Sequence, residues 1–303
     1  LATGGIAAVR VDGSFSNGMP SEGRLLWVMQ GPEAKRWKTM VEIEEVISEA
    51  VDNVEARREA FFADPQDVEA AHKYRVSIRT IRGLLAFVKP YLQRDRLARL
   101  QADWKSLVVP TSRLREYDVL AAEIGQLEPR EDALLDAIAA AREDECAATL
   151  AALQSKSARK CFERACKQSR NLVWKPSFDN EGMGSKAVSK RFDKVVDELR
   201  HDLETLDLAD VERTHDVRKR AKQARYAAER FESLVGEGAE EVAAEMKAEQ
   251  DRLGALCDAR VNVGIIDEFS TKGLPEEALW ALSLLRARNE QYIYETLRAQ
   301  QSE

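Results

Sequence analysis

The chain has 303 residues, of which 44% are hydrophobic and 33% charged, and its formal net charge is −7. This composition indicates a globular protein rich in helix formers, and no apolar run approaches the roughly 20 residues of a membrane span. The acidic balance argues against a general nucleic-acid binder. The four cysteines form no C-x-x-C pair and no secretion signal is visible, so we expect a cytoplasmic protein with reduced thiols.

Residues 1–33 are rich in Gly and Ser and lack periodicity. They leave three interpretations open, namely an expression tag, a disordered tail or a short strand over Arg24–Gln30. From Glu33 onward almost every segment has helical periodicity. We expect helices over about 35–63, from an Asp64 N-cap with Pro65 at the first position to near Pro90, over 95–108 and over 111–126. Pro129 is expected to open a further long helix, with Ala-rich periodicity from Asp132 into Cys166. A linker follows over 174–185, and we then expect helices over 186–206, from an Asp207 or Asp210 cap to near Gly236, over 239–271 and over 275–300.

Two of these helices carry the same basic pattern, His-x-x-Arg-x-x-x-(Arg/Lys)-x-x-Arg. A helix turns by about 100° per residue, so offsets of 0, 3, 7 and 10 fall on one narrow stripe. The second copy follows the first by 143 positions, from His72 to His215, and suggests two halves that face one polyanion. The stripes consist of His72, Arg75, Arg79 and Arg82 in the first copy, and His215, Arg218, Lys222 and Arg225 in the second, with Lys219 beside them.

The opposite side of each stripe helix is apolar and predicts a core face. On the first helix the core residues are Ile81, Leu84, Leu85 and Val88, and on the second Ala224, Ala227, Ala228 and Phe231. The helix before each stripe obeys the same offset, so the repeat is of whole helical bundles and not of short solenoid units.

A solvated surface is the ordinary explanation of a charged helix face, but such faces usually carry Glu–Lys pairs four residues apart. These stripes lack local acids, so we expect an anion, or carboxylates from other helices, to neutralise them. Glu116, Asp118 and Asp258 are the candidates for interhelical pairing.

The histidine at the head of each stripe has three possible roles. A metal site needs three or four ligands, and the chain has only His72, His201 and His215, so we expect no metal. A core histidine stays open. We favour a hydrogen-bond donor to an anion at the edge of each stripe.

Further basic groups lie outside the stripes, and each fits surface solubility as well as it fits ligand binding. The largest shares one helix face, since its members recur at spacings of three and four. The candidates from these groups are Lys156, Arg159, Lys160, Lys186, Lys190, Arg191 and Arg286.

Taken together and in order, these segments resemble the CHAD family, the conserved histidine α-helical domain. The resemblance covers about residues 36–303 and rests on both stripes, on Arg115-Glu116-Tyr117-Asp118-Val119, on Leu253–Ala259 and on Trp280, Arg286 and Arg288. One departure is Glu116, which stands where the family usually has Asp and lengthens an expected interhelical salt bridge.

The resemblance implies an all-α domain over 34–303, made of two pseudo-symmetric four-helix bundles over 34–177 and 178–303. Their basic faces would line a central channel or groove that binds inorganic polyphosphate without catalysis, in the cytoplasm or at polyphosphate granules. No cofactor, membrane or specific nucleic acid is expected, and the oligomeric state stays open.

Three other functions compete with polyphosphate binding, and the third is a purely structural scaffold that binds no ligand. An enzyme acting on polyphosphate or triphosphates needs a phosphate loop or a metal-carboxylate site, but no G-x-x-x-x-G-K-(S/T) exists. Glu42-Ile43-Glu44 resembles the start of a CYTH motif, yet Val46 replaces its Lys and the segment has helical periodicity. An accessory domain of such an enzyme stays possible. A nucleic-acid binder would be expected to expose aromatic residues, which make up 7% of the chain and lie mostly at core positions.

Overall fold

The computed structural model describes the chain except for residues 1–5, 11–14, 17, 18, 21–23, 30, 31, 129, 130, 176–184, 302 and 303. Two antiparallel strand pairs come first: β1 (Ile6–Arg10) pairs with β4 (Arg24–Met29), and β2 (Phe15–Ser16) pairs with β3 (Met19–Pro20). Of the three interpretations of the N-terminal segment, the strand is the one that the structure contains, over Arg24–Met29, and Gln30 lies outside the described residues. The rest of the described chain is helical, which confirms the predicted all-α class.

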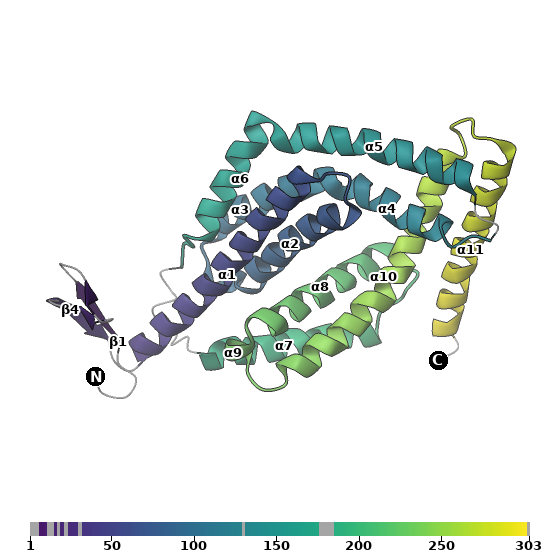
Figure 1. Cartoon of the computed structure of the whole chain (residues 1–303). Helices are drawn as coiled ribbons and strands as arrows, with labels where there is room; N and C mark the ends of the chain where they lie inside the picture. Colours follow the sequence, from purple (N-terminus) through teal and green to yellow (C-terminus); the bar gives the residue numbers. More distant parts are fainter. Residues whose placement is uncertain are drawn as a thin grey trace.

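The first helices form a hairpin and its cover. α1 (Pro32–Ala63) and α2 (Val68–Phe87) pack against each other, and η1 (Lys89–Tyr91) leads to α3 (Arg94–Val108). η2 (Val109–Thr111), α4 (Ser112–Ile124) and α5 (Asp132–Gln154) follow, and α6 (Lys156–Ser169) returns onto α3 and α1 (Figure 1).

The second set begins with α7 (Ser185–Glu204), α8 (Val211–Arg230) and the single turn α9 (Glu232–Val235). The long α10 (Ala239–Phe269) packs along α8 and then reaches α4, and α11 (Glu276–Gln300) folds back on α10. α10 therefore connects the second set of helices to the first.

Three hydrophobic cores hold these helices together. The largest is built around Tyr74 and Trp104, but it also takes in Phe192 of α7 and Phe231 at the end of α8. A second lies among α4, α5, α10 and α11, and a third among α7, α8 and α10. The cores do not divide at residues 177 and 178, so the arrangement into two duplicated bundles stays a prediction.

Two predicted boundaries are wrong. Asp64 and Pro65 lie in the turn after α1, and Asp67 is the N-cap of α2, where its side chain accepts a 2.8 Å hydrogen bond from the backbone N–H of Glu69. The Ala-rich segment from Asp132 to Cys166 is two helices, because the Ser155 hydroxyl caps the N-terminus of α6 at the backbone N–H of Ala158. Asp210, rather than Asp207, caps α8.

Candidate functional site

The two stripe helices lie side by side and run in the same direction. Gly83 of α2 faces Gln223 and Tyr226 of α8, and further along the Phe87 and Phe231 rings lie 5.6 Å apart between centroids. A Cβ atom at Gly83 would lie 3.0 Å from Cδ2 of Tyr226, so glycine lets the helices approach closely here. Tyr226 is the counterpart of Gly83 at the offset of 143, so equivalent positions of the two helices become neighbours.

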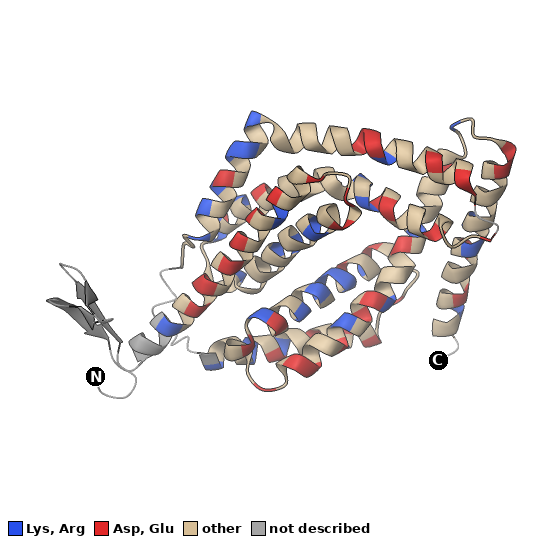
Figure 2. Ribbon diagram, viewed as in Figure 1, with Lys and Arg blue, Asp and Glu red and all other residues tan. Residues whose placement is uncertain are grey.

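The apolar faces of both helices are buried as predicted. Leu84 and Leu85 on α2 and Ala224 and Ala227 on α8 expose 2% or less of their surface. Because these residues fix the rotation of each helix, the basic residues lie on the sides left over. Figure 2 shows Lys and Arg along α8 and acids along α1, away from α8.

Three cations meet where α2 and α8 pack, namely Arg79, Arg218 and Lys222. Burial, then Arg218, then Arg79 lower the pKa of Lys222 from 10.5 to about 7. Burial is also the largest cause of a lowered pKa at Arg79, with Arg218 next. Like charges held at partial burial disfavour one another, so this cluster favours an anion beside it.

Carboxylates neutralise the cluster only in part. Arg218 lies 3.4 Å from Asp258 of α10, and Arg225 lies 3.3 Å from Glu229 on its own helix. Among the described residues, no carboxylate lies within ion-pair distance of Arg79, Arg82 or Lys222. Of the three expected interhelical acids, Asp258 alone pairs with a stripe residue.

The other two acids have different partners. Asp118 is buried and accepts a 2.6 Å hydrogen bond from Nε of Arg142, which joins α4 to α5. Glu116 pairs with Arg113 one turn away on α4, so the salt bridge that the resemblance implied between helices is instead local. The longer side chain of Glu116 reaches Arg113. Burial, then Arg79, lowers the pKa of Arg75 to about 10, and the charge of Glu116 opposes this only in part.

Gly254 of α10 makes room for Arg218. A Cβ atom at this position would lie 2.9 Å from Nη2 of Arg218, closer than real Cβ contacts allow. The glycine therefore lets the guanidinium of Arg218 approach α10 closely, where its Nη1 lies 3.4 Å from Asp258.

The first stripe widens into a second basic group around His72, Arg75 and Arg115. Arg115 of α4 lowers the pKa of His72, after burial, and also that of Arg75. Arg75 is partly committed to the fold, since its Nη1 donates to Thr111 and Ser112 at 3.1 and 3.0 Å. Sequence reasoning did not place Arg115 in the site, although it lies within the segment Arg115–Val119 on which the resemblance rests.

Several buried donors in this region have no hydrogen-bond partner within the described residues. They are Nδ1 of His72 and the Nε atoms of Arg75, Arg82, Arg218 and Arg225. Buried polar atoms normally have hydrogen-bond partners, so these five unpaired nitrogen atoms add to the electrostatic cost of the cationic cluster. His215 is more exposed than His72, and partial burial, then Arg218, lowers its pKa.

The remaining candidates are not brought into this cluster. Lys156, Arg159 and Lys160 lie exposed on α6, which packs on α3 and α1 and lies apart from α8 in Figure 1. Lys186 and Lys190 are exposed on α7, whereas Arg191 is half-buried near Tyr91. Arg286 on α11 pairs with Asp267 and Glu290, both at 2.8 Å, and Lys219 is exposed beside Asp216.

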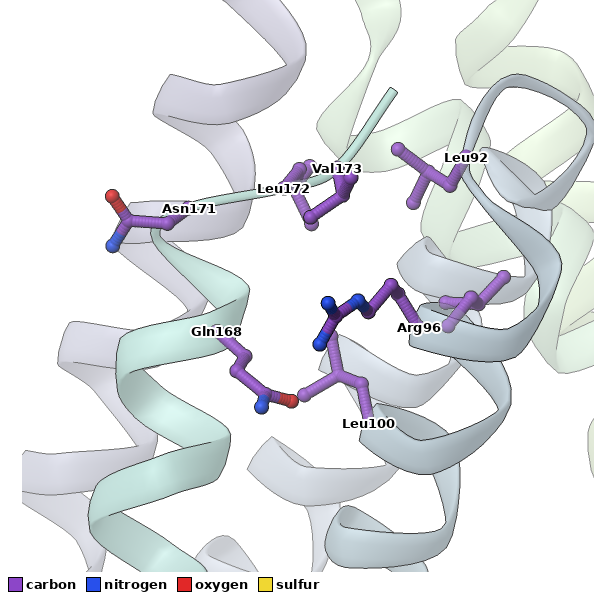
Figure 3. Close-up of a pocket in the computed structure, with 8 residues that line it drawn as sticks. Leu92, Arg96, Leu100, Gln168, Asn171, Leu172 and Val173 are labelled. Atoms are coloured by element: carbon purple, nitrogen blue, oxygen red, sulfur yellow. The ribbon is translucent and has the colours of Figure 1, made fainter. Parts of the chain in front are cut away.

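Two cavities lie elsewhere and differ in chemistry from the stripes. One, of about 70 Å³, lies between α3 and the end of α6 and holds a single charged side chain, Arg96 (Figure 3). The other, of about 400 Å³, is bordered by four glutamates beside Trp280, which would repel phosphate. Neither cavity suits a polyanion.

Metal ligands and membrane spans were also sought in the described part of the chain. There, no three His, Cys, Asp or Glu side chains gather closely enough to hold a metal ion. Glu42 and Glu44 lie on α1, as their helical periodicity predicted. None of the described helices combines the length and apolarity that crossing a bilayer requires.

The fold and the site define an all-helical protein in which two adjacent helices present cationic faces. The family model of the CHAD domain matches residues 45–267, and the chain belongs to this family. The crystal structure of the CHAD domain from the plant Ricinus communis is similar, with a TM-score of 0.65 and 18% identity over 85% of this chain and 91% of that one.

A second solved structure, PptA from Streptomyces chartreusis, has a TM-score of 0.56 and 17% identity over 86% of this chain and 97% of that one. At these identities the likeness shows the fold alone. No curated protein matches the sequence.

Proposed function

We propose that this protein binds inorganic polyphosphate along the facing stripes of α2 and α8, without catalysis. The observation that carries the proposal is the group of Arg79, Arg218 and Lys222, which meet at partial burial while Arg79 and Lys222 have no carboxylate partner within the described residues. Such a cluster is electrostatically unfavourable alone and favourable around an anion.

The arrangement suits a flexible phosphate polymer better than a small anion. The basic side chains continue from His72 to Arg82 on α2 and from His215 to Arg225 on α8, so many phosphates could be held at once. Guanidinium groups give phosphate a bidentate fork, and lysine acts as a point charge. Each charge-assisted hydrogen bond contributes about 1.5–3 kcal/mol, and counterion release adds a salt-dependent term.

Membership of the CHAD family supports the same ligand, because the family is linked with polyphosphate-related proteins. Polyphosphate granules are the corresponding place of action. The site offers no pattern for base stacking, since none of the stripe residues is Phe, Tyr or Trp, and Tyr226 beside the second stripe is buried.

The direct test is a titration with polyphosphate of defined length at two salt concentrations. The variant Arg79→Glu with Lys222→Glu removes two contacts and adds repulsion, so affinity falls by about 100-fold or more and the salt slope decreases by about 1 to 2. Arg79→Gln with Lys222→Gln serves as the milder pair, and circular dichroism checks that both variants are folded.

The matched control is Lys194→Glu with Arg99→Glu, which makes the same charge change at exposed positions of α7 and α3. Unchanged affinity in both stripe variants, or equal losses in the control, rejects the assignment. Competition with single-stranded nucleic acid at fixed salt tests the nucleic-acid alternative. Release of inorganic phosphate in the presence of a divalent metal would overturn the non-catalytic part.

A further inference from the structure

The helix α11 carries an exposed face on the side opposite its core contacts, and Figure 1 shows this helix at one end of the molecule. The aromatic residues Trp280 and Tyr294 expose 62% and 63% of their surface. Between them lie Leu284, Ala287 and Gln291, which are also exposed. These five residues form the α11 face, because their alternating spacings of four and three place them along one line of a helix. The same spacing forms the seam of paired helices, so the α11 face has the pattern of a contact surface.

The cavity of about 400 Å³ beside Trp280 lies at the start of the α11 face. Its apolar lining consists of Leu127, Trp280, Ala281 and Leu284, and four glutamates border it. None of these glutamates has an ion-pair partner within the described residues. A group that fits this cavity must therefore bring an apolar ring or chain and a positive charge close together.

The far end of the same helix carries such a pair of groups. Tyr294 is exposed, and Arg298 is exposed one turn later on the same side of α11. Tyr294 follows Trp280 by fourteen residues, which corresponds to about 21 Å along a helix. The end of α11 therefore cannot reach the cavity of its own chain, but the same segment of a second copy can.

Two copies of α11 that pack antiparallel bring these ends together twice. Ala287 lies midway between Trp280 and Tyr294, so a two-fold axis at Ala287 sets each Trp280 against the partner's Tyr294. In this order the partner's Arg298 lies beside the glutamates at the start of the helix. A parallel pairing would instead set the two acidic ends against each other. The antiparallel contact uses the same patch on both chains and is therefore closed.

We propose that the α11 face binds a second copy of this chain, with the partner's Tyr294 in the cavity beside Trp280 and the partner's Arg298 facing its glutamates. The inference is independent of the proposed function, because none of these residues belongs to the two basic stripes. From Trp280 to Arg298 the contact is about 27 Å long, which is small for a specific interface, so the dimer forms in a concentration-dependent way.

The test is sedimentation velocity of the full chain from about 1 to 100 μM. We expect the mass to rise with concentration from 34.1 kDa toward twice that value. Tyr294→Ala is expected to weaken dimerisation by about tenfold or more, because aromatic anchors carry much of the energy of an interface. Tyr292→Ala is the matched control and is expected to leave dimerisation unchanged. Tyr292 is 41% exposed on the same helix but lies about 100° around it from Gln291.

A cysteine at the expected two-fold axis tests the antiparallel order. Ala287→Cys is expected to give a disulfide-linked dimer under mild oxidation, because the two copies of this position face each other. Tyr292→Cys is the control, and the parent chain gives the background from its own four free cysteines. Circular dichroism checks that every variant is folded, as expected for substitutions at exposed positions.

A parent chain that stays at 34.1 kDa up to about 100 μM overturns the proposal and leaves a basic, aromatic segment of another protein as the occupant of the cavity. Equal weakening by Tyr294→Ala and Tyr292→Ala also overturns it, because the dimer contact then lies elsewhere. Cross-linking of Tyr292→Cys as strong as that of Ala287→Cys rejects the antiparallel contact in the same way.

Discussion

Replacing Lys222 by Met is expected to stabilise the fold while weakening polyphosphate binding. The folded protein depresses the pKa of Lys222 from 10.5 to about 7, so folding opposes its protonation. Since one pKa unit corresponds to about 1.36 kcal/mol, the full shift would cost about 4.8 kcal/mol. The side chain is partly exposed, and solvent screening reduces this to the order of 2 kcal/mol.

The sign of the effect depends on pH in a defined way. Below pH 7 both the folded and unfolded chains carry a charged Lys222, and the whole penalty is present. Between pH 7 and 10.5 the unfolded chain binds more protons than the folded one, so the penalty fades as pH rises. Lys222→Met, which carries no charge, should therefore gain most at or below pH 7 and much less at pH 9.5.

Urea unfolding followed by circular dichroism at pH 7 and pH 9.5 measures this gain. Lys219→Met is the control, because Lys219 is exposed on the same helix and its replacement should change the free energy of unfolding by less than about 0.5 kcal/mol. A Lys222→Met protein that is no more stable than the parent at pH 7 would refute the reasoning that the cationic cluster is strained in the free protein.

Three other predictions follow from the same contacts. Because a bound polyanion restores the charge of Lys222, polyphosphate affinity should fall as pH rises above about 7, by up to about tenfold per pH unit. Titrations of the parent at pH 6.5, 7.5 and 8.5 should show this fall, and titrations of Lys222→Met should not. Gly254→Ala should displace the Arg218 guanidinium and weaken polyphosphate binding by about three- to tenfold, as measured by the same titration. Because the far end of a flexible side chain can move, the free energy of unfolding in urea should stay within about 1 kcal/mol of the parent. Asp118→Ala should destabilise the fold by about 3–5 kcal/mol in urea unfolding, since it leaves Arg142 buried without its partner, and Asp118→Leu with Arg142→Met should recover most of the loss.

The helical periodicity of the sequence sufficed for most elements, and it failed where one side chain decides a boundary. The Ala-rich pattern through Gln154 gives no sign of a break, yet the Ser155 hydroxyl caps a new helix. Asp64-Pro65 is a good capping pair in isolation, but the chain turns once more and Asp67 takes the role. Such choices depend on the packing of the neighbouring helices, which periodicity does not contain.

The stripes themselves were predictable because side-chain direction on a helix follows from spacing alone. The carboxylates that pair with them were not predictable, because pairing between helices depends on how the helices cross. Asp118 belongs to Arg142 and Glu116 to Arg113, while Arg115 approaches His72 from α4. A search for acids at fixed offsets could not distinguish these cases, since all of them lie within one short segment.

The structure also makes the two stripes unequal, which their shared pattern does not suggest. Arg75 is held by Thr111 and Ser112, whereas its counterpart Arg218 is held by Asp258. The next residue of each stripe is Arg79 on α2 and Lys222 on α8. Neither has an ion-pair partner within the described residues, and the two helices pack closely there. A polyanion would therefore gain most at this point, because the charges nearest to each other are also those that the protein leaves unpaired.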